Sequence, residues 1–257
     1  MCEIYGYSGT QEKFLNEDLK EFYSHSIDHP NGWGLALFKK QQTEIIREVC
    51  RADCSSCLKN LLANPLTSQN ALAHIRLATI GNEEYDNCHP FTATDNSGRQ
   101  WTLIHNGTIF ESKNLGKYIF RQKGETDSEK ILLYLVDCIN DVIRQTGHSL
   151  SAKKRFEVLD NLICHSSSKN KLNLLIYDGE TMYVHTNFKN SLYMRKEKNR
   201  ITFSTRPLSH GIWKNVKFTT LLGYQNGELV FTGTNHGNEY FFDADSYKSL
   251  YLAYANL

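Results

Sequence analysis

The spacing of apolar residues along the chain predicts several helices. The clearest lies over 127–144, where Ile131, Leu135 and other apolar residues fall on one broad face. Thr126 precedes this segment as the expected N-cap, and Glu129, three residues later, completes a capping box. Shorter segments of helical spacing predict further helices over 12–23, 58–63 and 151–165.

Alternating or continuous apolar runs bounded by turn residues predict strands. Two hairpin turns are expected, at Tyr177-Asp178-Gly179-Glu180 and at Asn226-Gly227. Two adjacent helices between two groups of strands fit an α+β layered sandwich better than a doubly wound sheet. The strands are expected over 2–7, 33–38, 43–49, 70–78, 101–105, 172–177, 182–185, 191–195, 200–204 and 216–218.

Composition restricts the class of protein. The 257 residues are 40% hydrophobic and 22% charged, with a net charge of +1, which is ordinary for a globular chain. No basic tract indicates a nucleic-acid partner, and no apolar run is long enough to cross a membrane. Seven cysteines, an odd number without a secreted pattern, and no signal peptide predict a cytoplasmic protein with reduced thiols.

Cys2 is a candidate nucleophile because of its position. Removal of Met1 would leave a cysteine with a free α-amino group. An α-amine has an ordinary pKa of about 7.7–8.0 and a thiol about 8.5, so one residue would carry both a nucleophile and a base near neutral pH. Alone, a cysteine here is more typical of a small residue that starts a strand.

Four segments combine polar residues with the expected ends of strands. Each has an ordinary explanation of its own: Arg76 in a surface ion pair, Asn106-Gly107 as a turn, and Asp127 as complement to a helix dipole. The segments are Asn31-Gly32-Trp33-Gly34, Arg76-Leu77-Ala78-Thr79, His105-Asn106-Gly107-Thr108 and Gly124-Glu125-Thr126-Asp127-Ser128-Glu129.

In this order after Cys2, the segments resemble the class II glutamine amidotransferases of the N-terminal-nucleophile hydrolase superfamily. The details resemble the small stand-alone YafJ-like and ergothioneine-pathway-like members, which share the look of Cys2-Glu3, His74-Ile75-Arg76 and His89-Pro90-Phe91. The resemblance implies a four-layer αββα sandwich. It extends over 2–208, and we expect one domain over 1–257 with a strand-rich extension over 209–257.

The resemblance also implies catalytic roles. Cys2 would attack the side-chain amide carbon of glutamine, and its α-amine would carry the proton to the departing ammonia. The oxyanion would be held by the side-chain amide of Asn106 and the backbone N–H of Gly107. Glycine at 107 would permit a close backbone approach, with a positive φ if required. No cofactor is implied.

Substrate recognition follows from the same resemblance. Arg76 would bind the α-carboxylate as a bidentate pair, Thr79 would supply a hydroxyl, and Asp127 would hold the α-ammonium. Ile80 stands where some members carry a histidine, which leaves the neighbouring pocket contacts open. The segment 31–34 is expected to shape the pocket floor without taking part in the chemistry.

Other chemistry-bearing residues have ordinary interpretations. Cys50, Cys54 and Cys57 lack a second paired motif with a fourth ligand, so a metal site is not expected. The histidines within the motifs are expected to be hydrogen-bonded structural residues, because an N-terminal amine mechanism needs no histidine base. They are His29, His74, His89 and His105.

The sequence therefore predicts an enzyme that hydrolyses the side-chain amide of glutamine or a γ-glutamyl amide through a Cys2 acyl-enzyme. One alternative is an N-terminal-cysteine amidase for bulky acyl groups, of the bile-salt or penicillin V type. Another is a non-catalytic γ-glutamyl-binding subunit. The expected partner is a small substrate, with a separate acceptor or peptidase subunit left open, because about 50 residues after Leu208 cannot form a synthetase domain.

Overall fold

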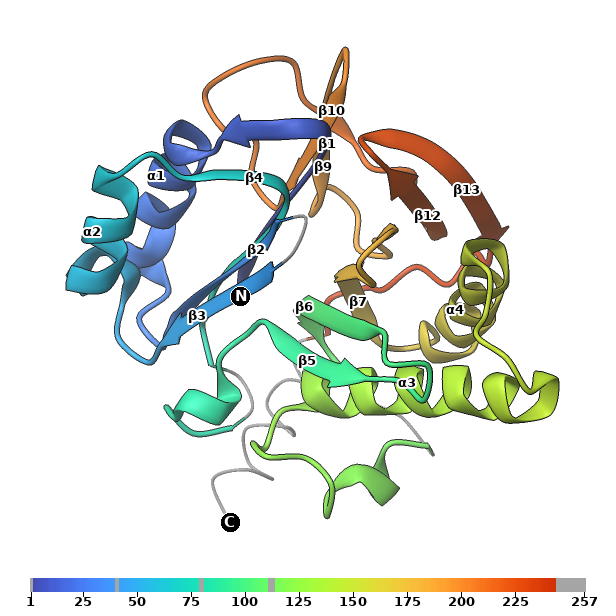
Figure 1. Cartoon of the computed structure of the whole chain (residues 1–257). Helices are drawn as coiled ribbons and strands as arrows, with labels where there is room; N and C mark the ends of the chain where they lie inside the picture. Colours follow the sequence, from blue (N-terminus) through green and yellow to red (C-terminus); the bar gives the residue numbers. More distant parts are fainter. Residues whose placement is uncertain (1, 40–41, 79–80, 111–113, 244–257) are drawn as a thin grey trace.

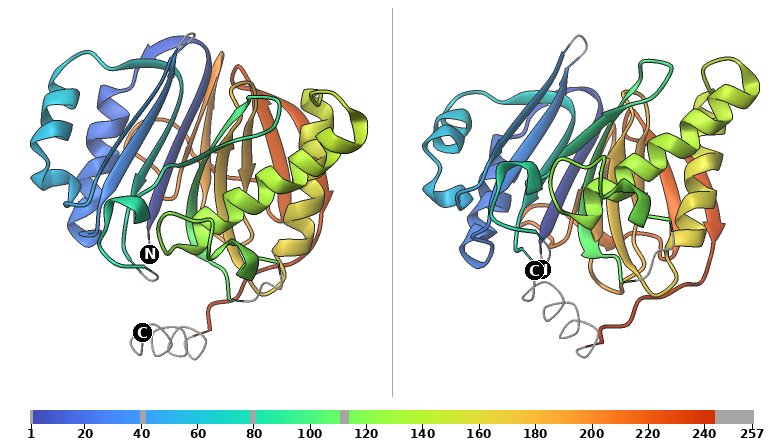
Figure 2. Two further views of the ribbon diagram at one scale, coloured as in Figure 1. Left: turned by 60° about the horizontal axis from the view of Figure 1, so that its bottom comes forward. Right: turned by 90° about the horizontal axis from the view of Figure 1, so that it is seen from below.

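Two antiparallel sheets face each other, and a pair of helices covers the outer side of each (Figure 1). The computed structural model describes residues 2–39, 42–78, 81–110 and 114–243. Within these ranges the layers follow the order helix, sheet, sheet, helix, as the two turned views make plain (Figure 2). This is the four-layer αββα arrangement predicted from the sequence.

The first sheet has the strand order β11-β9-β10-β1-β4-β2-β3. Strand β1 lies at its centre, between β10 and β4, so the start of the chain is held by neighbours on both sides. The strands are β1 (Glu3–Phe14), β2 (Trp33–Lys39), β3 (Gln42–Glu48), β4 (Thr67–Ile75), β9 (Tyr193–Glu197), β10 (Arg200–Ser204) and β11 (Lys214–Asn215).

The second sheet has the order β13-β12-β8-β7-β6-β5. Its outer strands β12 and β13 come from the segment after residue 208, so that segment extends the sheet. The strands are β5 (Phe91–Thr94), β6 (Gln100–Thr108), β7 (Lys171–Tyr177), β8 (Met182–His185), β12 (Thr220–Gln225) and β13 (Glu228–Asn235).

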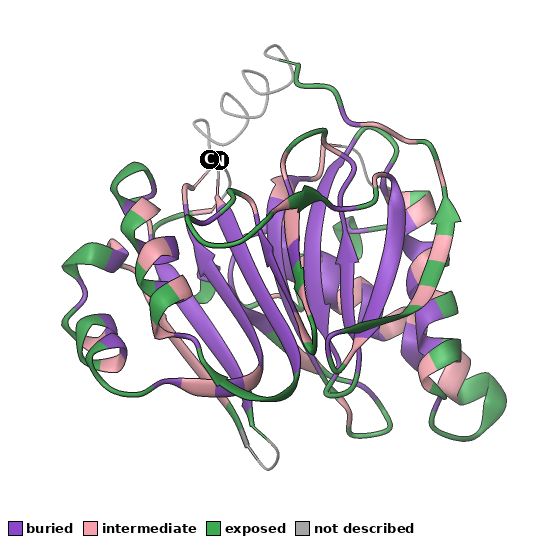
Figure 3. Cartoon of the chain, turned by 90° about the horizontal axis from the view of Figure 1, so that it is seen from above, coloured by how far each residue is buried: buried purple, intermediate pink, exposed green. Residues whose placement is uncertain are grey.

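Three apolar clusters hold the layers together. Helices α1 (Asn16–Ser24) and α2 (Ser56–Ala63) pack on the first sheet, and α3 (Asp127–Thr146) and α4 (Ala152–Ser166) pack on the second. A third cluster, which includes Ile4, lies between the sheets. The central strands, such as β1, β2, β4, β6 and β7, are buried along most of their length, whereas edge strands such as β13 and the outer faces of the helices are exposed (Figure 3).

Helix α3 begins and ends where its local sequence allows. The hydroxyl of Thr126 accepts a hydrogen bond from the backbone N–H of Glu129 at 3.3 Å, as the predicted N-cap requires. The Glu129 carboxylate instead accepts from the backbone N–H groups of Lys123 and Gly124, so the predicted capping box is only half formed. Gly147, with φ of 74°, ends the helix in the left-handed conformation.

Several expected elements differ from the observed ones. For example, the strands expected over 70–78 and 191–195 are found at Thr67–Ile75 and Tyr193–Glu197. The helix over 12–23 begins only at Asn16, because Lys13 and Phe14 pair with β4 and extend β1. The strand over 216–218 is absent; Thr219 adopts a φ of 51°, and the pairing strand β12 starts after it. The strand over 101–105 continues to Thr108, where it pairs with Lys171.

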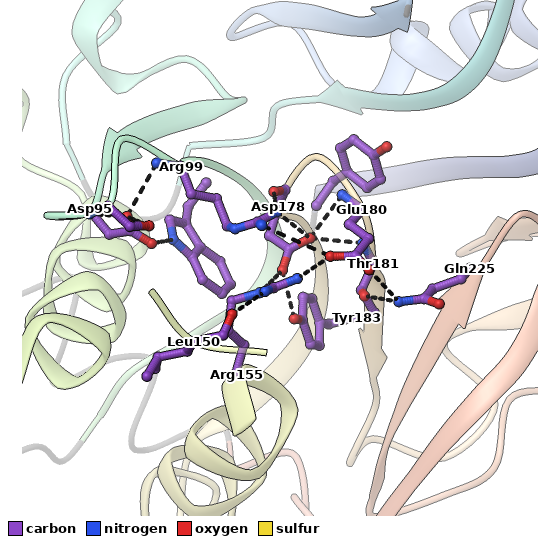
Figure 4. A network of polar contacts seen from close by, with 12 residues as sticks. Asp95, Arg99, Leu150, Arg155, Asp178, Glu180, Thr181, Tyr183 and Gln225 are labelled. Atoms are coloured by element: carbon purple, nitrogen blue, oxygen red, sulfur yellow. Dashed lines mark hydrogen bonds and ion pairs between the residues drawn. The ribbon is translucent and has the colours of Figure 1, made fainter. Parts of the chain in front are cut away.

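A buried ion-pair network fixes the hairpin turn between β7 and β8 (Figure 4). Arg155 of α4 donates from Nε to the Asp178 carboxylate at 2.6 Å and from Nη2 to Glu180 at 2.6 Å. The Tyr183 hydroxyl donates to the same Asp178 carboxylate at 2.8 Å. Burial and the Asp178 carboxylate raise the pKa of Tyr183 well above its ordinary value.

Candidate active site

Strand register places Cys2 beside Arg76. Strands β1 and β4 are antiparallel with Glu3 opposite Ile75, so one further step brings Cys2 alongside Arg76, where β4 ends. The Cys2 Sγ lies 3.3 Å from the carbonyl oxygen of Leu77, to which it donates, and 3.4 Å from the backbone nitrogen of Leu77, from which it accepts. The predicted nucleophile is thus held against the segment that carries Arg76.

The environment of Cys2 favours the neutral thiol. Burial raises the pKa of Cys2, while the Leu77 N–H and the positive charges of Arg76 and Lys171 act in the opposite direction. Because the net shift is upward, the thiol needs a base to become a nucleophile at neutral pH.

Strand β6 brings Asn106 and Gly107 to the inter-sheet side of the site, because β6 contacts both β1 and β4. These two residues lie within the strand, not in a turn that follows it. A Cβ at position 107 would fall 1.9 Å from the Lys171 carbonyl oxygen and 2.2 Å from Nε2 of His105. The close approach expected of Gly107 is therefore present, without a positive φ.

Lys171 is a polar neighbour of the site that the sequence analysis missed. It is the first residue of β7 and fully buried, and its Nζ donates to Oδ1 of Asn106 at 3.3 Å. Burial lowers its pKa to about 8, with the neighbouring Cys2 opposing that shift. Only the β6–β7 register brings this lysine to Asn106, and the sequence gives no sign of it.

Asp127 opens α3 and is half-buried. Its Oδ2 accepts a hydrogen bond from the backbone N–H of Ile109 at 2.7 Å, and its Oδ1 accepts from the Ser128 hydroxyl at 3.3 Å. That hydroxyl is also 3.0 Å from Nδ1 of His105, whose Nε2 lies 3.0 Å from the Lys171 carbonyl. Asp127 is therefore connected to the end of β6 through a short polar chain.

Arg76 is buried just beyond β4. Its Nη1 donates to the carbonyl of Asn82 at 3.0 Å and its Nη2 to that of Gly81 at 2.9 Å. Asn31 fixes the same segment, because its Oδ1 accepts from the backbone N–H of Ala78 at 2.9 Å. This contact gives the segment 31–34 a specific supporting role. Thr79, the expected hydroxyl, lies outside the described residues.

The motif histidines divide into two groups. His29 and His105 are hydrogen-bonded, as predicted. His74 and His89 stack with ring centroids 4.0 Å apart, and among the described residues neither imidazole has a hydrogen-bond partner, so the expectation of hydrogen-bonded rings is wrong for this pair. Burial lowers the pKa of His74 to about 3 and that of His89 well below its ordinary value, so both rings are neutral.

The cysteines of the 50–57 segment are free thiols, two of them exposed. Within the described ranges, no three His, Cys, Asp or Glu side chains gather in a way that could hold a metal ion. Nor does any helix there have the length and apolar character needed to span a membrane.

Two open clefts lie at different ends of the sandwich. One, of about 560 Å³, is lined by residues that include Asn70 and Tyr177, at the ends of β4 and β7 remote from Cys2. Another, of about 530 Å³, is lined by Phe110, Tyr240 and neighbours. Phe110 follows Ile109, whose backbone N–H donates to Asp127 at the start of α3. This second cleft therefore lies near the end of β6 that is next to Asp127.

Comparison with known proteins identifies the family. The family model described as "Glutamine amidotransferases class-II" matches residues 1–200. The chain belongs to the class II glutamine amidotransferases. Membership supports hydrolysis or transfer of the glutamine amide as the general activity of this amidotransferase.

Relatives of this amidotransferase include YafJ of Escherichia coli K12, which is 30% identical over 73% of this chain and 74% of its own length. The uncharacterised protein MJ1515 of Methanocaldococcus jannaschii is 26% identical over 90% of this chain and 71% of its own.

Solved structures have the same fold. A predicted glutamine amidotransferase from Pseudomonas aeruginosa superposes with a TM-score of 0.64 at 18% identity, covering 90% of this chain and all of the other. The glutamine phosphoribosylpyrophosphate amidotransferase of Bacillus subtilis gives 0.64 at 16% identity, covering 89% of this chain and 48% of the other.

Proposed function

We propose that this amidotransferase cleaves the side-chain amide of glutamine, or of a γ-glutamyl amide, through a thioester on Cys2. The observation that carries the proposal is the position of Cys2 directly before β1 and in register with Arg76. The charge of Lys171, which bonds to Asn106, also acts on the Cys2 thiol. A nucleophile, an anion-binding group and an oxyanion donor thus come from three different strands or strand ends.

The chemistry proceeds in two balanced steps. With Met1 removed, the α-amine of Cys2 takes the thiol proton as Sγ attacks the amide carbon, and Asn106 Nδ2 and the Gly107 N–H hold the oxyanion. Collapse breaks the C–N bond, and the same proton leaves on ammonia or the amine. Water then attacks the thioester with the α-amine as base, which releases the γ-carboxylate and restores the thiol.

Substrate recognition is assigned to two side chains of opposite charge, Arg76 and Asp127. Arg76 binds the α-carboxylate and Asp127 the α-ammonium, so the site selects the free amino-acid end that glutamine and γ-glutamyl compounds share. A bulky apolar acyl chain offers neither group, which disfavours the bile-salt and penicillin V type of substrate.

The test is a substrate panel of glutamine, glutathione, γ-glutamyl amides and penicillin V, read by glutamate or acid release. Cys2→Ala is expected to abolish turnover, and Cys54→Ala, which changes an exposed thiol, to leave it unchanged. The intact mass of active enzyme should lack one methionine. Full activity with Met1 retained, or turnover of penicillin V alone, would contradict the proposal.

A further inference from the structure

Lys171 carries a charge in a place where charge is costly. Its side chain has no solvent exposure. Transfer of an ammonium out of water costs free energy unless the charge is paired and hydrogen-bonded in the protein. Its Nζ lies 3.3 Å from Asn106 Oδ1 and 5.0 Å from the centroid of the Phe188 ring. Buried, perturbed amines of this kind concentrate at functional sites.

The same residue flanks both proposed oxyanion donors. Its ammonium contacts the side chain of Asn106, and its backbone carbonyl packs so closely on Gly107 that position 107 admits no Cβ. The carbonyl oxygen also lies 3.0 Å from Nε2 of His105, and this contact fixes the imidazole ring next to β6. One residue of β7 thus shapes the surroundings of two neighbouring residues of β6.

The contact determines which way the Asn106 amide faces. An ammonium can only donate hydrogen bonds, so the amide atom opposite it must be the oxygen. Nδ2, which carries the donors of the amide, is then directed away from Lys171. The positive charge of the Lys171 ammonium next to Oδ1 also polarises the amide, which strengthens Nδ2 as a hydrogen-bond donor.

We propose that Lys171 is a positioning residue of the oxyanion hole, which holds the Asn106 amide with its N–H groups toward the acyl carbonyl of the substrate. This inference rests on the proposed function, because it assigns Asn106 the role of oxyanion donor. In this role Lys171 acts through Asn106.

A double-mutant cycle tests the proposal. Lys171→Met removes donor and charge at nearly constant length, and it should lower kcat on glutamine or a γ-glutamyl amide about 10- to 100-fold, with KM nearly unchanged. In an Asn106→Ala background the same change should cost clearly less than in the wild-type background, because the group that Lys171 orients is gone and only the effect of its charge on Cys2 remains. Equal losses in both backgrounds would overturn the proposal.

Two further variants control for folding. Lys171→Gln keeps a hydrogen-bond donor without the charge and should retain more activity than Lys171→Met. Lys196→Met changes a partly exposed lysine of β9 that bonds to Gly227, and it should leave kcat unchanged. If Lys171→Met does not fold, as judged by thermal unfolding, the cycle is repeated with Lys171→Gln; equal losses there would likewise overturn the proposal.

A second readout needs no substrate. The Asn106 side-chain amide, assigned in ¹⁵N-asparagine spectra by its loss in Asn106→Ala, should shift as Lys171 titrates. The experiment uses Cys2→Ala protein so that the thiol is absent, and because Cys2 raises the Lys171 pKa, the titration there should fall below about pH 8. Two other titratable groups lie near the site. They are His105, whose pKa is lowered by burial, and the α-amine of residue 2, so the effect of Lys171 is the part of the shift that Lys171→Met removes. Persistence of the shift in Lys171→Met would overturn the inference even if no γ-glutamyl compound is turned over.

Discussion

Arg76 and Asp127 are the side chains to which we assign substrate choice, and each also supports the protein backbone. Arg76 bonds to two carbonyls after β4, and Asp127 bonds to the N–H of Ile109. A variant must therefore remove the charge without removing the support. Asp127→Asn meets this condition, because its amide oxygen can still accept from Ile109.

We expect Asp127→Asn to lower kcat/KM on glutamine roughly 30- to several-thousand-fold, because the substrate ammonium loses its partner. This corresponds to a loss of about 2–5 kcal/mol of transition-state stabilisation. With 4-carbamoylbutanoate, which lacks the α-amino group, wild type and Asp127→Asn should differ little. Arg76→Gln, whose amide N–H groups can still donate to a carbonyl, should show the matching pattern with an α-carboxylate ester of glutamine. Near-wild-type rates on glutamine for both variants would refute the zwitterion reading.

His74 gives a second prediction at the residue scale, concerning stability. Its pKa is about 3 in the fold and about 6.5 when unfolded, so between these values the unfolded chain binds a proton that the folded chain does not. The neutral His74 ring therefore contributes to the free energy of unfolding above pH 6.5, and this contribution is lost as the pH falls toward 3. His74→Gln should reduce the slope of unfolding free energy between pH 6 and 4 by about 1.4 kcal/mol per pH unit. Urea titrations at both pH values measure it, and an unchanged slope would contradict it.

At the scale of elements, the β7–β8 turn depends on its attachment to α4. Asp178→Ala should lower the unfolding free energy by about 3–5 kcal/mol, because it leaves the buried Arg155 guanidinium without its main partner. Glu180→Ala removes an exposed carboxylate from the same guanidinium and should cost less than about 1 kcal/mol. Denaturant unfolding measures the free energy of unfolding of both variants. Similar losses of stability would mean that the burial of the carboxylate does not determine how much it stabilises the turn.

Local patterns predicted most elements, and the misplaced residues show what such patterns lack. The apolar face and Thr126 cap of α3 are local features, and the helix begins where they indicate. The apolar spacing of 12–23 is equally helical, yet pairing with β4 takes Lys13 and Phe14 into a strand. Tertiary pairing of this kind overrides local preference.

The candidate site divides in the same way. Cys2, Arg76, Asn106 and Asp127 were found because their motifs are contiguous in sequence and resemble a family. Lys171 belongs to no motif, and its proximity to Asn106 depends on the register of β6 with β7 and on side-chain direction. Neither quantity is encoded in a local window of sequence.

At the scale of the whole molecule, strands β12 and β13, which follow Leu208, belong to the second sheet. Strand β12 pairs with β8 and buries Leu221 and Leu222. Truncation after Leu208 should therefore give an unfolded or aggregating protein, since β8 would become an exposed apolar edge. Circular dichroism and size-exclusion chromatography check this. A folded, active 1–208 fragment would show instead that the extension is dispensable.

The central position of β1 also has a consequence for synthesis. Cys2 is among the first residues made, but β1 pairs on one side with β10, and the hydrogen bond from Ile4 to Thr205 joins residues 201 positions apart. At about 5–20 residues per second, roughly 10–40 seconds separate their emergence from the ribosome. During that interval the strand that carries the thiol lacks one of its neighbours. On the proposed mechanism, amide hydrolysis would therefore have to wait until translation has passed Thr205.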